Sequence, residues 1–169
     1  TTALHVENDF PEESFPILDA GPTTTGLEST VISLVGVPTI LRLGATSVGS
    51  LREILPEITT QIPKQQVDSP GTSKRHYAPK TPFYIWSNQK LTKEDGVLLF
   101  GTTIPEGVDH VWDLSDDPVQ AGKRLYAALR EMDQSHLRTL YVVLPSQDKT
   151  GQKDWLAIMD RLRRATQSG

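Results

Sequence analysis

The sequence predicts an α/β fold in which residues 80–169 form a domain built on a mainly parallel sheet. Short apolar runs in this part alternate with stretches whose apolar residues recur at helical spacing. Strands that alternate with helices are typical of a parallel sheet covered by those helices. The expected strands are Phe83–Trp86, Gly96–Phe100, His110–Trp112 and Leu140–Leu144, and the expected helices are Pro118–Asp133 and Asp154–Thr166.

The first of these helices has a well-marked start. Asp117 is the expected N-cap, because its carboxylate can accept hydrogen bonds from the first N–H groups of a helix. Pro118 follows at the first helical position, where a missing N–H costs little. Leu125, Leu129 and Met132 then recur on one side of the helix. We expect this side to pack on the sheet.

The residues before position 69 predict a smaller unit. Ser29–Val35 is apolar and β-branched, and Thr39–Arg42 follows it after a Gly-Val-Pro turn, so the two segments predict a hairpin. Ser47 is expected to cap a short helix, and Pro56 is expected to end it.

Three further elements are expected around this hairpin. Thr1–Asn8 matches the end of a helix. Phe15–Ala20 matches a short edge strand, because it is apolar and carries an early proline. Ile58–Lys64 matches a strand that leads into the next segment.

The composition of the chain argues against several classes of protein. The chain has 169 residues, of which 37% are hydrophobic, and a formal net charge of -4. It contains no cysteine, which excludes disulfides and thiolate chemistry, and its charge gives no general case for nucleic-acid binding. No apolar run is long enough to cross a bilayer, so we expect no membrane segment and a cytoplasmic location. The chain starts at Thr1 rather than Met, and we expect a processed or excised piece of a longer protein.

The segment Ser69–Pro79 reads Ser-Pro-Gly-Thr-Ser-Lys-Arg-His-Tyr-Ala-Pro and is too rich in Pro and Gly for a helix or a central strand. Its basic side chains surround Tyr77, so it could lie along an anion that has an aromatic part. The alternative is an interdomain linker whose charges keep it soluble. Composition alone favours the linker, and a linker can also act as a lid.

This segment resembles the linker signature Ser-Pro-Gly-Met-Lys-x-x-His-Tyr-Ala-Pro of the long-form L-threonylcarbamoyladenylate synthases. Glu28–Val31 and Ile40–Ala45 resemble two motifs near the end of the YrdC-type catalytic domain of that family. Arg124–Asp133 and Ala157–Ala165 resemble the two helices of its C-terminal domain. The matches occur in family order and cover nearly the whole chain.

The resemblance implies three parts. Residues 1–68 would be the C-terminal remnant of a YrdC-type α/β domain, and residues 69–79 would be the linker. Residues 80–169 would be a small Rossmann-like α/β domain with a mainly parallel sheet.

The resemblance also implies a nucleotidyltransferase. The full-length enzyme would convert threonine, bicarbonate and ATP into threonylcarbamoyl-AMP and pyrophosphate. A downstream tRNA-modifying transferase complex would use the product to make threonylcarbamoyladenosine in tRNA. Mg²⁺ would accompany ATP, because a triphosphate needs a hard cation.

The family's functional residues map onto five positions. Ser29 would hold threonine, Arg42 would contact ATP, and Arg75, His76 and Tyr77 would close over the nucleotide. From the residues alone, a turn-capping role for Ser29 is favoured over a binding role, and Arg42 could be a cross-strand or surface arginine.

The chain departs from the family pattern at two places. Leu43 stands where the family usually has proline, which would make the turn after Arg42 less rigid. Thr72 and Ser73 stand where the family has Met-Lys.

Two sets of residues are interpreted as having no catalytic or metal-binding role. The four histidines lack metal-ligand spacing, so we expect no protein-bound metal site. Asp160 with the arginines Arg161, Arg163 and Arg164 is interpreted as a charge cluster on a helix surface.

The chain does not contain the family's Lys-x-Arg element or its Ser-x-x-Ser-Ala-Asn segment. We therefore expect these residues alone to be inactive. The alternative is a non-catalytic binding or regulatory module that docks onto another protein.

Overall fold

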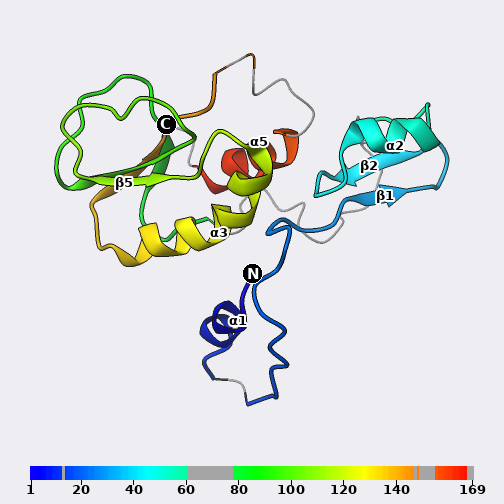
Figure 1. The fold of residues 1–169 in the computed structure, drawn as a ribbon, viewed down its shortest axis with the longest axis horizontal. Helices are drawn as coiled ribbons and strands as arrows, with labels where there is room; N and C mark the ends of the chain where they lie inside the picture. The colour runs from blue at the N-terminus through cyan, green and yellow to red at the C-terminus, as the bar shows by residue number, and fades with distance from the viewer. Residues whose placement is uncertain (13, 61–77, 147, 149–154, 167–169) are drawn as a thin grey trace.

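The computed structural model describes residues 1–12, 14–60, 78–146, 148 and 155–166. It contains an antiparallel pair of strands and a separate four-stranded sheet (Figure 1). The elements in chain order are α1 (Ala3–Asp9), β1 (Val31–Ser33), β2 (Thr39–Arg42), α2 (Val48–Ile54), β3 (Phe83–Ile85), β4 (Asp95–Leu99), β5 (His110–Asp113), α3 (Pro118–Gln134), β6 (Thr139–Val142) and α5 (Leu156–Ala165).

The larger sheet confirms the predicted fold class. Its strand order is β3-β6-β4-β5, and all three pairings are parallel. Leu98 on β4 and Leu140 on β6 are fully buried in one core with Leu125 of α3 and Leu162 of α5. Both helices therefore cover the same face of the sheet. A smaller core on β4 contains Val97, together with partly buried side chains from neighbouring strands and loops.

The predicted start of α3 is confirmed. Asp117 is the N-cap, and its Oδ1 accepts hydrogen bonds from the N–H groups of Val119 (2.7 Å) and Gln120 (3.3 Å). The helix then runs for 17 residues with Leu125 and Met132 fully buried. It is the longest element described, and its other side is available to the N-terminal segments.

The predicted hairpin is present, but its first strand is shorter than expected. β1 pairs antiparallel with β2, and Val31 lies opposite Arg42. The prediction extended β1 to Val35, whereas Leu34 is 69% exposed and Val35 is 83% exposed in the turn that follows Ser33. The apolar run continues past the last paired residue, so composition overstated the strand.

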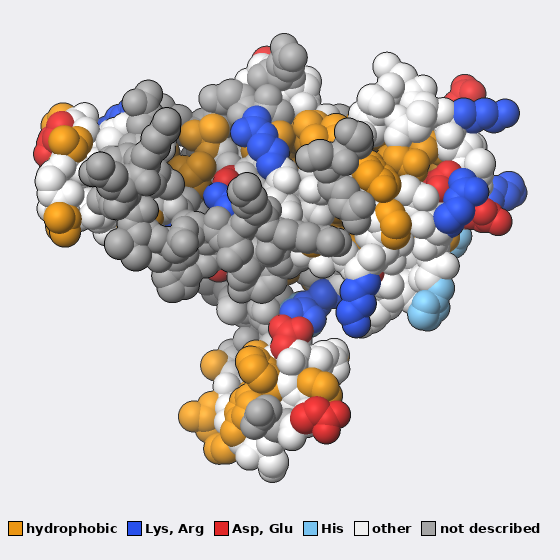
Figure 2. Space-filling model, turned by 180° about the vertical axis from the view of Figure 1, so that it is seen from behind, with side chains coloured by type: hydrophobic (Ala, Val, Ile, Leu, Met, Phe, Trp, Pro, Cys, Tyr) orange, Lys and Arg blue, Asp and Glu red, His pale blue; other side chains and the backbone are white. Residues whose placement is uncertain are grey.

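The predicted edge strand at Phe15–Ala20 is wrong. Residues 14–20 form no strand, and no ladder partner for them is described. Phe15 instead packs edge-on against Phe10, with ring centroids 5.6 Å apart, and Leu18 is 97% exposed. These N-terminal residues lie at the bottom of the molecule in both views, and Figure 2 shows hydrophobic side chains gathered there.

The predicted strand Ile58–Lys64 is only partly within the described residues. Thr59 makes one isolated parallel bridge to Thr39, and its flanking residues 58 and 60 belong to no strand. Residues 61–64 lie outside the described part of the chain.

The N-terminal region contacts α3 closely. Leu27 packs against the large core. Gly26 has a φ of +75°, and a Cβ atom built on it would lie 2.4 Å from the Cα of Lys123. Arg130 donates to both carboxylate oxygens of Asp9 at 2.9 and 2.6 Å. Glycine at position 26 lets the chain pass directly over the helix backbone.

Candidate functional site

Ser29 and Arg42 lie side by side at one end of the β1–β2 hairpin. The Nε of Arg42 donates to the backbone oxygen of Ser29 at 3.2 Å, and Nη2 donates to Ser29 Oγ at 3.3 Å. Ser29 is exposed and Arg42 is partly buried. The Ser29 hydroxyl can accept from Arg42 and still donate its own hydrogen to an anion. A hydroxyl beside a guanidinium is a donor set that suits a carboxylate or a phosphate.

The two ends of the hairpin are held together by a close backbone contact. A Cβ atom on Gly44 would lie 2.3 Å from the carbonyl oxygen of Glu28 and 2.4 Å from the backbone of Ser29. The N–H of Ala45 donates to that same Glu28 oxygen at 3.0 Å. Only glycine allows the segment after Arg42 to approach the segment before Ser29 so closely.

A buried arginine from α5 reaches the same junction. Arg161 of α5 is 5% exposed. Its Nε donates to Glu28 Oε2 at 3.0 Å, its Nη2 to the backbone oxygen of Leu43 at 2.7 Å, and its Nη1 to Asp160 Oδ2 at 2.6 Å. All three nitrogens of the guanidinium therefore have an acceptor.

The carboxylate of Glu28 receives a second donor from α3. Tyr126 donates its hydroxyl to Glu28 Oε2 at 2.9 Å. Burial raises the pKa of Glu28, but the hydrogen bonds that its carboxylate accepts and the charge of Arg161 outweigh burial, so that pKa lies below its ordinary value. Burial and the nearby Glu28 charge raise the pKa of Tyr126 well above its usual range, so the phenol keeps the proton that it donates.

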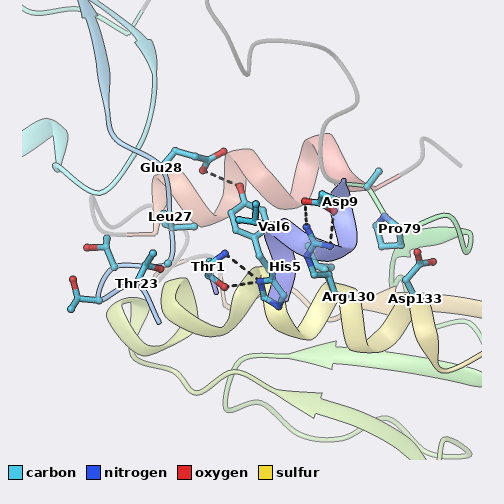
Figure 3. A pocket seen from close by; sticks show the side chains of 16 residues that line it. Thr1, His5, Val6, Asp9, Thr23, Leu27, Glu28, Pro79, Arg130 and Asp133 are labelled. Carbon is cyan, nitrogen blue, oxygen red and sulfur yellow. Dashed lines mark hydrogen bonds and ion pairs between the residues drawn. The ribbon is translucent and has the colours of Figure 1, made fainter. Parts of the chain in front are cut away.

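A large cavity adjoins this junction (Figure 3). Its volume is about 800 Å³, and it lies between α1, residues 23–28, Ala78–Pro79 and α3. Glu28 lies at one end of the view and the Asp9–Arg130 pair at the other. The hydrogen bonds from Arg130 lower the pKa of Asp9. Ser29 and Arg42 do not line this cavity, so their pair is a neighbouring and separate feature.

One protein-family model matches most of the chain. The model described as "Threonylcarbamoyl-AMP synthase, C-terminal domain" matches residues 46–167, which is most of the sequence. The chain belongs to this family. The resemblance that the motifs indicate is thereby confirmed.

Members of the threonylcarbamoyl-AMP synthase family are similar along nearly the whole chain. The chain is 30% identical over 186 residues to the threonylcarbamoyl-AMP synthase of Pyrococcus abyssi (strain GE5 / Orsay) and 31% identical over 188 residues to that of Bacillus subtilis (strain 168). Each match covers 98% of this chain but only 53% and 52% of the relatives. The chain thus spans about half the length of the curated relatives it matches.

Solved structures from the family share the fold. The crystal structure of P. abyssi Sua5 complexed with L-threonine matches with a TM-score of 0.78 at 28% identity, covering 98% of this chain and 53% of that one. The structure of a variant of P. abyssi Sua5 matches with a TM-score of 0.76 at 24% identity, covering 98% of this chain and 52% of that one, which supports the fold alone. The predicted mixed α/β fold with a parallel sheet is confirmed.

The five predicted site residues of this family member divide into two groups. The structure brings Ser29 and Arg42 into direct contact. The linker residues Arg75, His76 and Tyr77 lie outside the described residues, so their role and the predicted division at residues 69–79 stay predictions.

The sequence interpretation of the C-terminal charge cluster was wrong for Arg161. Its side chain is buried and bonds to Glu28 and to the Leu43 carbonyl, rather than lying on a helix surface. The spacing carries a signal for this, because Arg161 lies four residues from both Ala157 and Ala165, which are buried on the same side of α5. The motif Glu28–Val31 assigns no role to Glu28, and no sequence signal singles out Tyr126.

No group of three or more His, Cys, Asp or Glu side chains among the described residues is placed to hold a metal ion. We therefore assign no Mg²⁺ ligand to the residues described. None of the helices in this part of the family member is long and apolar enough to span a membrane.

Proposed function

We propose that the chain is part of an L-threonylcarbamoyladenylate synthase that makes threonylcarbamoyl-AMP from threonine, bicarbonate and ATP. The observation that carries the proposal is the contact between Ser29 and Arg42 in a chain of this family. In the reaction, the threonine amine attacks the carbon of bicarbonate, and the bicarbonate hydroxyl leaves as water with a proton from the amine, which gives a carbamate. A carbamate oxygen then bonds to the α-phosphorus of ATP, and the bond to the departing pyrophosphate breaks.

Each side chain of the pair has a separate task in this proposal. The Ser29 hydroxyl would donate to the carboxylate of threonine, and the Arg42 guanidinium would contact a phosphate of ATP. Their 3.3 Å contact would place a carboxylate and a phosphate at adjacent positions. The pair would then hold two of the three reactants close together, which lowers the barrier to reaction between them. The relative solved with L-threonine supports threonine as the substrate class.

The remaining parts of the proposal concern groups around the pair. Arg75, His76 and Tyr77 would close over the nucleotide, and Mg²⁺ would arrive bound to the phosphates of ATP. The product would pass to a tRNA-modifying transferase complex in the cytoplasm. We propose no direct contact between this chain and nucleic acid, because the net charge of -4 offers no basic surface overall.

A non-catalytic binding or regulatory module is the second candidate. The exposed apolar side chains around Phe10, Phe15 and Leu18 favour it, because such a surface suits docking onto another protein. The two candidates differ in whether Arg42 affects turnover.

Arg42→Ala in the full-length parent protein is expected to weaken the use of ATP by about 1.5–3 kcal/mol, the range for a hydrogen bond to a charged group. The measurement is kcat/KM for ATP in a pyrophosphate-release assay. Arg52→Ala is the matched control, because Arg52 is exposed on α2. Unchanged ATP kinetics in folded Arg42→Ala would show that the arginine is structural.

A polypeptide of residues 1–169 alone is expected to release no detectable pyrophosphate from ATP, threonine and bicarbonate. Charge on the reacting phosphate must be stabilised by several positioned cations, and the chain supplies only part of the family's set. The assay compares equal amounts of this polypeptide and of the full-length parent. Turnover near the parent's rate would place the whole catalytic set within residues 1–169.

A further inference from the structure

The guanidinium of Arg161 joins the C-terminal domain to both ends of the β1–β2 hairpin. Glu28, which accepts from Nε, comes directly before Ser29 in the chain, and Leu43, whose backbone oxygen accepts from Nη2, comes directly after Arg42. Arg161 therefore holds Glu28, next to the hydroxyl of Ser29, and Leu43, next to the guanidinium of Arg42.

We propose that Arg161 is a positioning residue, which sets the distance between Ser29 and Arg42 by holding Glu28 and the Leu43 carbonyl together. Arg161 does not contact the candidate site itself in the described structure. This inference rests on the proposed function for its link to threonine and ATP, but the geometric claim stands on the contacts alone.

The geometry of the guanidinium suits this role. Its planar fork presents N–H groups in fixed directions, so acceptors at 3.0 and 2.7 Å cannot move independently of each other. The third acceptor, Asp160, lies on α5 itself at 2.6 Å and also accepts from Arg164. That carboxylate anchors the fork to its own helix.

The second donor to Glu28 strengthens the arrangement. Tyr126 reaches the same oxygen, Oε2, from α3 at 2.9 Å. Glu28 is thus held by two helices of the C-terminal domain at once. Because α3 and α5 share one core, a shift of either helix would be transmitted to Glu28 and hence to Ser29.

A purely stabilising role makes a different prediction. Buried ion pairs often add little to stability compared with apolar replacements of similar size. If Arg161 only joined the two units, an apolar replacement that still folds would leave the Ser29–Arg42 geometry and the substrate affinities unchanged. If Arg161 is a positioning residue, its replacement changes the Ser29–Arg42 geometry and, with it, substrate binding and turnover. Misplacing reactive groups by about 1 Å can cost roughly 100-fold in rate.

The first test uses residues 1–169 and needs no activity. In Arg161→Met, hydrogen exchange is expected to speed up roughly 10-fold at the Ala45 amide, whose N–H bonds to Glu28, and at Arg42 Nε. The Leu114 amide, which bonds to Leu99 in the parallel sheet, is expected to keep its rate and serves as the internal reference. Unchanged exchange at Ala45 and Arg42 would overturn the proposal.

The second test measures KM and kcat for threonine in the full-length parent. Arg161→Met is expected to raise the KM for threonine roughly 10-fold or more, and Arg161→Lys to restore it only in part, because an ammonium keeps the charge but loses the fork. Arg130→Met is the matched control, since it removes a different arginine–carboxylate contact, the one between α3 and Asp9. It is expected to leave both constants within about twofold.

The outcomes separate this inference from the proposed function. If the native parent releases no pyrophosphate, the proposed function fails, and the exchange test alone decides the positioning role. If the parent is active, faster exchange with unchanged KM and kcat would show that Arg161 is only structural. Where Arg161→Met does not fold, Glu28→Gln replaces it in both tests, because it keeps the side-chain shape and removes the charge.

Discussion

Gly26→Ala is expected to lower the free energy of unfolding by about 2–5 kcal/mol. Two costs add. An alanine in the left-handed region costs about 1–2 kcal/mol, and forcing a methyl group into packed atoms costs about 1–3 kcal/mol. The φ of Gly26 is +75°, and its Cβ would lie 2.4 Å from the Cα of Lys123 on α3. The backbone of a helix cannot move aside as the end of a flexible side chain can.

Gly21→Ala is the matched control for this substitution. Gly21 has a φ of +86°, but a Cβ there meets no atom within 4 Å. It should therefore show only the conformational cost of about 1–2 kcal/mol. Urea unfolding of both variants isolates the contact with α3 as the difference between them. Equal losses would mean that the chain at Gly26 does not cross α3 as closely as described.

Trp155→Ala is expected to cost about 3–5 kcal/mol of stability, the range for removing a large buried aromatic side chain. Trp155 is 1% exposed and packs edge-on against Phe100, with ring centroids 5.4 Å apart. The ring fills space between α5 and the end of β4, and neighbouring side chains can close only part of the gap. The loss should appear as a lower midpoint in chemical denaturation.

An exposed apolar residue of the same domain provides the comparison. Val119 on α3 is 60% exposed, so Val119→Ala should change stability by no more than about 0.5 kcal/mol. A small effect at Trp155 as well would contradict its place in the core.

Much of the C-terminal domain could be predicted because its signals are local. The cap at Asp117 and the proline after it mark the start of α3 through contacts within one turn. The apolar run at Gly96–Phe100 marks β4, whose five residues are all buried. Such elements depend on residues near each other in sequence, so pattern and propensity suffice.

The wrong predictions concern residues whose structure depends on contacts with residues far away in the sequence. Phe15–Ala20 has the composition of a strand, but a strand also needs a neighbouring backbone, which composition does not show. Arg161 is charged and was assigned to the surface, yet Glu28 and the Leu43 carbonyl, far away in sequence, let it be buried. The contact between Ser29 and Arg42 depended on hairpin register, which the strand lengths alone did not fix.

The order of the parallel sheet affects how the domain is made. β6 is the last strand in the described part of the chain, yet it lies between β3 and β4, and its Leu140 is opposite both Phe83 and Gly96. During synthesis β3 therefore has no strand beside it until Val142 has left the ribosome. Pairings between distant segments form slowly, because loop closure must come first. We expect β3 to join the sheet in a late step, with its apolar face exposed to chaperones until then, whereas β4 can pair with β5 earlier.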